Sequence, residues 1–276
     1  MEIGYHAQTW GSVAGHPGGV TSIKDLFYVT GGDMTVAARE IGQAGYAGTE
    51  MFDGDLQKHA DEPSTLRDAL SAAGVELVSV YAGANFIYPD VLDDELWRIT
   101  RACELANMFG AERLVVGGGS RRATGTTDGD YTLLGEGLTK VVEIAAAHGL
   151  DATYHPHLGT IVESPDELRT LMDRTSIGFC PDTAHLAAGG GDPAAVIRAH
   201  GDRVRHVHLK DIDMATGRFL PLGSGDLDFA DILRAIKETG YDSWLMVELD
   251  YYEGHPKDAA EISKAYLHDL LSHINA

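Results

Sequence analysis

Asp182-Thr183-Ala184-His185 is followed, after a Gly-rich turn and a helical pattern, by His206-Val207-His208-Leu209-Lys210-Asp211. Both segments have the form of a β-strand end that turns into a loop. Tyr154-His155-Pro156-His157 upstream and Val247-Glu248-Leu249-Asp250 downstream have the same form. Four consecutive predicted strands therefore end in side chains that can bind a metal ion or transfer a proton.

Outward from these segments, short β-rich runs alternate with longer helical patterns along the whole chain. The runs that predict strands are residues 2–10, 46–52, 75–81, 113–116, 150–155, 177–181, 204–209 and 244–249. The patterns that predict helices are residues 34–44, 63–73, 93–109, 131–148, 165–174, 192–201, 229–239 and 257–274. Residues suited to helix starts support several of these boundaries, such as Asp33 before the first helix and Ser164-Pro165 at the fifth.

Strict alternation of strands and helices predicts a parallel sheet, because each helix must connect two parallel strands. Eight such units in 276 residues, with no break in composition, favour one α/β domain, a single closed (β/α)8 TIM barrel over residues 1–276. An open doubly wound sheet is the alternative. Two glycine runs, Gly117–Gly119 and Gly189–Gly191, are predicted to be turns, and neither matches a dinucleotide- or phosphate-binding loop.

The net charge, the apolar runs and the number of cysteines exclude several classes of function. The formal net charge of −21 would repel phosphate backbones, so we expect no nucleic-acid partner. No apolar run approaches the roughly 20 residues of a membrane span, and the N-terminus has no basic region followed by an apolar run. We therefore expect no membrane association and a cytoplasmic location. Cys103 and Cys180 are too few for a disulfide framework and are expected to be buried thiols.

Four residues at the ends of the fifth to eighth predicted strands are candidate metal ligands: His155, Asp182, His208 and Glu248. The carboxyl ends of the strands of a barrel converge on one face, so these side chains should meet although they are distant in sequence. Two imidazoles and two carboxylates suit Mn²⁺, Co²⁺, Fe²⁺ or Zn²⁺ better than Ca²⁺, and we expect Mn²⁺. One such residue alone would be explained by hydrogen bonding at a strand end, but four in equivalent positions predict a metal site.

Four further residues are candidates for acid–base catalysis, in no order of preference: His157, His185, Lys210 and Glu50. Lys210 lies two residues beyond His208, so both side chains should face the mouth of the barrel. The simpler explanation of Lys210 is a salt bridge to a neighbouring aspartate, and that of the others is a hydrogen-bonded loop residue or a buried ion pair. By position alone, the residues expected to bind substrate in the other half of the mouth are His6, Trp10, Tyr81 and Asn85.

These motifs resemble the xylose isomerase-like TIM barrel superfamily of sugar-phosphate isomerases and epimerases, over essentially the whole chain. The segments most similar to its inosose dehydratase branch are 154–160, 182–186, 206–211, 221–225, 228–229 and 247–248. Most of the superfamily has a glutamate ligand at the end of strand five, where this chain has His155, in agreement with the dehydratase branch. The resemblance implies that Asp182, His208 and Glu248 take the remaining metal positions.

The resemblance also implies an activity, that of a divalent-metal-dependent carbon–oxygen lyase acting on a keto-polyol or keto-sugar. A proton α to a carbonyl would be removed and a β-oxygen eliminated through a metal-stabilised enediolate. Elimination from a 3-keto-glycoside is a related outcome. A sugar or keto-sugar isomerase or epimerase with the same metal site is the alternative. An endonuclease for abasic DNA, which the acidic charge opposes, and a non-catalytic barrel are less favoured.

The loops that would select the substrate are residues 11–33, 117–130, 213–228 and 250–257, and none contains a recognisable motif. The first is long and Gly-rich. Its composition fits a lid over the site, a contact between subunits of a homo-oligomer, or an ordinary surface loop.

Overall fold

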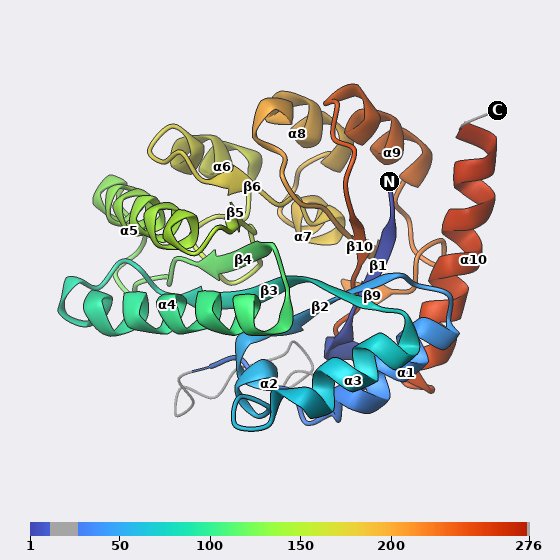
Figure 1. Cartoon of the computed structure of the whole chain (residues 1–276). Coiled ribbons are helices and arrows are strands. Elements are labelled where there is room, and N and C mark those ends of the chain that lie inside the picture. Colours follow the sequence, from blue (N-terminus) through green and yellow to red (C-terminus); the bar gives the residue numbers. More distant parts are fainter. Residues whose placement is uncertain (12–26, 275–276) are drawn as a thin grey trace.

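A computed structural model describes residues 1–11 and 27–274 of the chain. Most of the loop 11–33, and with it the expected lid or subunit contact, lies outside the described residues. Strands lie at the centre of the molecule and helices surround them (Figure 1). None of the helices within the described ranges combines the length and the apolar character needed to cross a membrane.

The central sheet has eight strands in the spatial order β6-β5-β4-β3-β2-β1-β10-β7, and all its pairings are parallel. Isolated parallel bridges join Phe179 to Val204 and Asp182 to His208, so the two ends of this order meet and the ring closes. The predicted (β/α)8 TIM barrel is therefore confirmed, and the open sheet is not formed. The strands are β1 (Ile3–His6), β2 (Gly48–Phe52), β3 (Glu76–Ala84), β4 (Arg113–Gly118), β5 (Asp151–Tyr154), β6 (Gly178–Phe179), β7 (His208–Leu209) and β10 (Leu245–Val247).

The outer layer consists of helices that connect consecutive strands, together with α10 after the last strand (Figure 1). The Asp33 carboxylate accepts hydrogen bonds from the first turn of α1, as predicted. Ser164 and Glu167 form a capping box at the start of α6, with Pro165 at the first helical position. The main helices are α1 (Met34–Gln43), α3 (Pro63–Ala73), α4 (Leu92–Phe109), α5 (Asp128–Ala147), α6 (Pro165–Met172), α8 (Pro193–Ala199), α9 (Phe229–Glu238) and α10 (Pro256–Ile274).

Two predicted local structures are wrong. The first strand ends at His6, because His6 Nδ1 accepts a hydrogen bond from Gln8 N (3.1 Å) and starts the 3-10 helix η1 (Ala7–Trp10). Of the glycine run 117–119, the first two residues belong to β4 rather than to a turn. A Cβ at Gly117 would lie 2.2 Å from the Tyr81 hydroxyl, so close packing requires glycine here.

Several short elements, most of them after strand ends, carry no clear sequence signal, and the pattern does not predict them. Most add a single helical turn, and the last two form a small antiparallel hairpin that begins just after Lys210. These elements are α2 (Asp53–Gln57), η2 (Pro89–Val91), α7 (Thr183–Ala188), η3 (Gly201–Arg203), β8 (Asp211–Asp213) and β9 (Arg218–Leu220).

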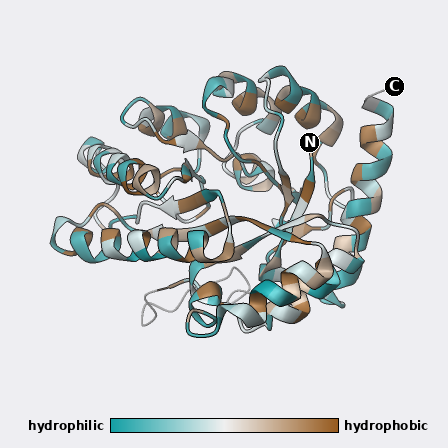
Figure 2. Cartoon of the chain, in the orientation of Figure 1, coloured by the Kyte–Doolittle hydropathy of each residue, from teal (hydrophilic) through white to brown (hydrophobic). Residues whose placement is uncertain are grey.

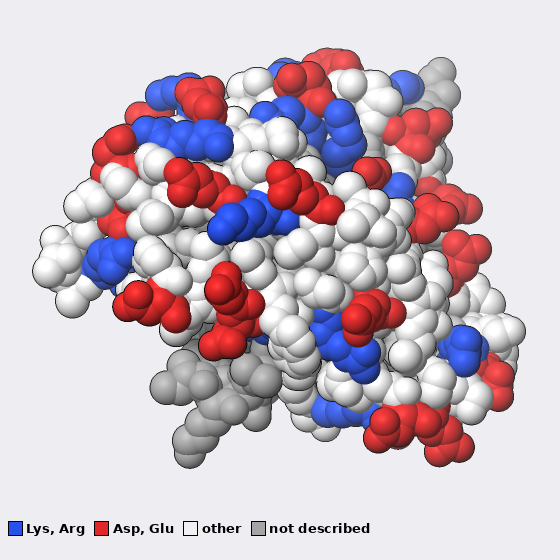
Figure 3. Space-filling model, turned by 60° about the vertical axis from the view of Figure 1, so that its left-hand side comes forward, with Lys and Arg blue, Asp and Glu red and all other residues white. Residues whose placement is uncertain are grey.

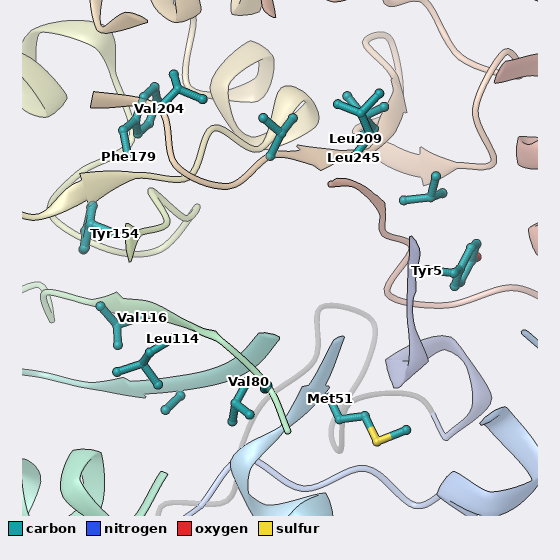
Figure 4. Close-up of a cluster of buried hydrophobic side chains, with 14 of the residues drawn as sticks. Tyr5, Met51, Val80, Leu114, Val116, Tyr154, Phe179, Val204, Leu209 and Leu245 are labelled. Carbon is teal, nitrogen blue, oxygen red and sulfur yellow. The ribbon is translucent and has the colours of Figure 1, made fainter. Parts of the chain in front are cut away.

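Side chains alternate along each strand between the helical layer and the interior of the barrel. Hydrophobic colour concentrates on the strands and on part of each surrounding helix (Figure 2). Outward-facing residues pack against the helices and include Tyr5, Met51, Val80, Leu114, Val116, Tyr154, Phe179, Leu209 and Leu245 (Figure 4). Smaller apolar clusters lie on the inward face: Val78, Trp244 and Met246, and Phe52, Tyr81, Val115 and Cys180. Cys103 and Cys180 are both buried, as predicted.

Acidic and basic side chains lie next to one another on the face of the molecule shown in Figure 3. One ion pair of the surface joins Arg169 to Asp166, whose side chains are 64% and 83% exposed. Such exposed pairs contribute at most about 1 kcal/mol to stability. The ionic interactions with larger consequences lie inside the barrel.

Candidate metal centre and active site

The four candidate ligands meet at the carboxyl ends of the strands. Asp182 pairs with His208 in a parallel bridge, and Glu248 directly follows β10, which pairs with β7. His155 Nε2 lies 3.4 Å from Asp182 Oδ2 and 4.0 Å from Glu248 Oε2. His208 Nδ1 contacts Glu248 Oε2 directly. All four side chains are buried.

In each carboxylate of this group, one oxygen is bound by neighbouring protein groups and the other faces the centre of the group. Asp182 Oδ1 accepts a hydrogen bond from His185 N (2.9 Å), because Asp182 caps α7. Glu248 Oε1 accepts one from Gln8 Nε2 (2.8 Å) and lies 2.8 Å from Lys210 Nζ. Asp182 Oδ2 and Glu248 Oε2 are therefore held toward the centre of the group.

The group has the properties of a cation site. His155 Nε2, Asp182 Oδ2, His208 Nδ1 and Glu248 Oε2 are buried and have no hydrogen-bond partner among the described residues. Ligand atoms of the four residues all lie within 4.8 Å of one another. Unpaired buried polar atoms are costly, and a cation would satisfy all four at once. Two nitrogens and two oxygens suit Mn²⁺, Co²⁺, Fe²⁺ or Zn²⁺, so these residues could hold such an ion.

Lys210 joins this group to two further residues. Its ammonium donates hydrogen bonds to Asp250 Oδ1 (2.9 Å) and His185 Nε2 (3.2 Å) and lies 3.4 Å from Asp182 Oδ2. The side chain is fully buried. Burial lowers the pKa of Lys210, but Asp182, Asp250 and Glu248 more than compensate and hold it well above its usual value. Lys210 is thus a permanent cation.

The two carboxylates of the group stay ionised. Burial opposes their ionisation, but Lys210 and then a neighbouring histidine hold the pKa of both Asp182 and Glu248 well below the usual range. Both can therefore act as anionic ligands at neutral pH.

His157 and His185 form a second pair of imidazoles beside the group. Their ring centroids are 3.9 Å apart, and the His185 ring also meets the edge of Phe219 at 5.1 Å. His157 Nδ1 donates to the Leu158 carbonyl (2.7 Å), which leaves the lone pair on Nε2. Burial, together with the neighbouring imidazoles and Lys210, lowers the pKa of both histidines. Both rings are therefore neutral at neutral pH.

Glu50 lies in the interior of the barrel beside His208. It is fully buried and is surrounded by donors: His206 Nε2 at 3.0 Å, His208 Nε2 at 3.1 Å, His6 Nε2 at 3.3 Å and the Ser79 hydroxyl. Burial raises the pKa of Glu50, but the interactions with His208, His206 and His6 outweigh it and hold the pKa well below its usual value. The Glu50 carboxylate therefore stays ionised.

The four residues expected to bind substrate divide into two pairs. His6 and Tyr81 are at the site: the Tyr81 ring meets His155 at 5.6 Å, and the His6 ring meets His208 at 6.3 Å. Trp10 faces the helical layer, where its indole nitrogen donates to Glu40 (2.6 Å). Asn85 is exposed, and its main chain is bound by Glu95. The structure does not bring Trp10 or Asn85 to the ligand group.

Several residues of the site were not singled out by the sequence, although a signal existed for some. His206 and Asp250 each lie two residues from a candidate ligand, so strand alternation could have placed them on the same face. Gln8 and Phe219 had no such signal, because one lies on η1 and the other on the unpredicted hairpin.

His206 makes the stability of the protein sensitive to acid. Burial lowers its pKa to about 4, although Glu50 raises it, whereas the unfolded chain has the usual value near 6.5. Between these values the unfolded state binds the extra proton, so stability falls as the pH decreases from about 6.5 to about 4, by at most about 3 kcal/mol. Urea unfolding of the metal-free protein at pH 7 and pH 5 measures this loss. The same loss in the His206→Gln variant would contradict the assignment.

Two curated relatives are similar to the chain over most of its length. An inosose dehydratase from Geobacillus kaustophilus (strain HTA426) is 31% identical over 272 residues, which cover 86% of this chain and 87% of that protein. The rhizopine catabolism protein MocC from Rhizobium meliloti is 32% identical over 269 residues, which cover 84% and 80%.

A solved structure is similar in fold alone. The 3-keto-D-glucoside 4-epimerase from E. coli, in its apo form, superimposes with a TM-score of 0.73 at 18% identity, over 98% of this chain and 99% of that one. The model of the xylose isomerase-like TIM barrel family matches residues 38–270. The chain therefore belongs to the xylose isomerase-like TIM barrel family.

Proposed function

We propose that this protein is a divalent-metal-dependent lyase that acts on a small keto-polyol or keto-sugar, such as an inosose or a 3-keto-glycoside. The observation that carries the proposal is the convergence of four unpaired ligand atoms, from His155, Asp182, His208 and Glu248, beside two neutral imidazoles. The relative named inosose dehydratase supports the choice of substrate class. A divalent cation, Mn²⁺ by preference, would supply Lewis acidity to the substrate carbonyl.

The acid–base roles follow from how each candidate is bound. We assign the removal of the proton α to the carbonyl to His157, because its Nε2 carries a free lone pair and its side chain is only half-buried. Lys210 is protonated, and we assign to it a hydrogen bond to the departing β-oxygen or to another substrate oxygen. Glu50 is enclosed by four donors and is not available as a base.

An epimerase is the second candidate, and one observation favours it. The His185 ring lies against the His157 ring, tilted by 40°, so two neutral imidazoles adjoin the same ligand group. One could remove a proton and the other could return it, which gives epimerisation or isomerisation without loss of water.

Incubation of the Mn²⁺-loaded protein with an inosose separates these functions. We expect a product that has lost water and absorbs in the ultraviolet, because elimination yields a conjugated or diketo compound. A product that has the mass of the substrate in ordinary water, and that incorporates deuterium at carbon when the reaction is run in heavy water, would instead establish the epimerase. No reaction with any inosose or 3-keto-glycoside would contradict both.

Two variants serve as controls for the assigned base. His157→Gln should bind Mn²⁺ normally and form product about 10²- to 10⁴-fold more slowly. His148→Gln changes a histidine at the end of α5 and should react as the unchanged protein does. Full activity of His157→Gln would remove His157 from the mechanism.

A further inference from the structure

Glu50 is surrounded by more hydrogen-bond donors than a structural ion pair would need. Three imidazole Nε2 atoms and one hydroxyl point at a single carboxylate, and none of the partners is an arginine or a lysine. The strands explain this convergence, because Glu50 pairs with His6 on β1 and with Ser79 on β3. A register shift between Thr49 and Glu50 adjusts the direction of the strand at this point.

The hydrogen bond at His6 Nδ1 determines which ring nitrogen of His6 carries the proton. His6 Nδ1 accepts from Gln8 N, so the ring proton of neutral His6 is on Nε2, which faces Glu50 Oε1 at 3.3 Å. Glu50 Oε2 accepts hydrogen bonds from the Ser79 hydroxyl, His206 Nε2 (3.0 Å) and His208 Nε2 (3.2 Å). Glu50 Oε1 lies 3.1 Å from His208 Nε2 and 3.3 Å from His6 Nε2 but has no hydrogen-bond partner among the described residues. Glu50 therefore accepts from Ser79, His206 and His208, and its charge faces the Nε2 proton of His6.

We propose that Glu50 is a positioning residue that keeps the ring proton of His208 on Nε2 and so directs the Nδ1 lone pair into the ligand group of His155, Asp182 and Glu248. The inference rests on the metal-dependent function proposed above. His208 Nε2 lies 3.1 Å from Glu50, and His208 Nδ1, on the other side of the ring, contacts Glu248 and has no hydrogen-bond partner among the described residues. A carboxylate behind a histidine ligand fixes its tautomer and raises its basicity.

A second group of candidate metal ligands shares His208 with the first. Glu50, His206 and His208 lie close enough to hold an ion among themselves. That ion would bind His208 through Nε2, whereas the positioning role requires binding through Nδ1. Glu50 Oε2 already accepts hydrogen bonds from His206 Nε2, His208 Nε2 and the Ser79 hydroxyl, and this favours the positioning role.

Nitrogen NMR of the histidine rings decides between the two arrangements. The probe is full-length protein with ¹⁵N-labelled histidine, loaded with diamagnetic Zn²⁺, and a His208→Gln sample assigns the signal. We expect His208 to show a metal-bound Nδ1 and a protonated Nε2. A metal-bound Nε2, or a proton on Nδ1, would overturn the proposal, and this test needs no variant of Glu50.

Metal affinity of a Glu50→Gln variant provides the second test. The amide group can accept at its oxygen only, so one of the imidazole donors loses its acceptor and His208 is free to move its proton to Nδ1. We expect the affinity for Mn²⁺ to fall about 10- to 100-fold. The matched control is Asp130→Asn, which neutralises another buried carboxylate, at the start of α5, and should leave the affinity unchanged.

The outcomes also separate this inference from the proposed function. Unchanged protein that binds neither Zn²⁺ nor Mn²⁺ would contradict the metal-dependent function and this inference together. Binding through His208 Nδ1 with full affinity in a folded Glu50→Gln variant would contradict the role of Glu50 alone. A loss of affinity in Glu50→Gln, together with the expected ring signals, supports both.

Discussion

Removal of divalent ions with a chelator is expected to lower the turnover of the substrate by at least about 10³-fold, which corresponds to about 4 kcal/mol of transition-state stabilisation. Without a cation, four unpaired polar atoms and two anionic carboxylates are left where negative charge would develop on the substrate. Addition of Mn²⁺ or Co²⁺ should restore the activity. A metal-free protein with full activity, verified by elemental analysis, would contradict the proposed function.

The Asp182→Asn variant tests the same site within the chain. Asp182 Oδ1 caps α7 and Oδ2 faces the ligand group, so asparagine can preserve the cap but places an amide nitrogen at the ligand position. We expect the fold to persist and the bound metal to be lost. Asp192→Asn is the matched control, because Asp192 caps α8 in the same way without facing the group. Equal metal content in both variants would remove Asp182 from the site.

Replacement of Lys210 by methionine is expected to destabilise the metal-free protein by about 3–5 kcal/mol. The ammonium is fully buried and contacts three carboxylates, those of Asp182, Glu248 and Asp250. Methionine fills a similar volume but leaves these negative charges close together without a cation. Urea unfolding with the chelator present measures the loss.

Two comparisons complete the test of Lys210. Arg169→Met removes a cation whose side chain is 64% exposed, and it should change the stability little. Mn²⁺ should recover part of the stability lost in Lys210→Met, because a second cation can partly neutralise the same carboxylates. A stability loss no larger than that of Arg169→Met would show that the three carboxylates do not need Lys210.

The sequence predicts the barrel and the ligand group for the same reason. A parallel barrel brings every strand end to one face, so residues such as His155 and Asp182 could be placed together without knowledge of their contacts. Lys210 could be assigned to the same face by strand alternation alone. The sequence did not reveal its partners, which include Asp250, 40 residues away, rather than a neighbouring aspartate.

Contacts that depend on irregular backbone could not be predicted. Gln8 reaches Glu248 only because the chain leaves β1 as a 3-10 turn. Glu50 was expected to be a catalytic candidate from its strand end, but its place among three imidazoles depends on a register shift in the ladder of β2 and β3. Trp10 was assigned by position along an expected strand that ends four residues earlier.

Backbone pairing between neighbouring strands differs in extent around the barrel. β3 and β4 pair continuously from Ser79↔Arg113 to Ala84↔Gly118, whereas the boundary between β6 and β7 has only isolated bridges. Asp182 and His208 stand on opposite sides of that boundary. An ion held by both would cross-link the seam where backbone pairing is sparsest, so occupancy of the site would govern local opening and amide hydrogen exchange there as well as chemistry.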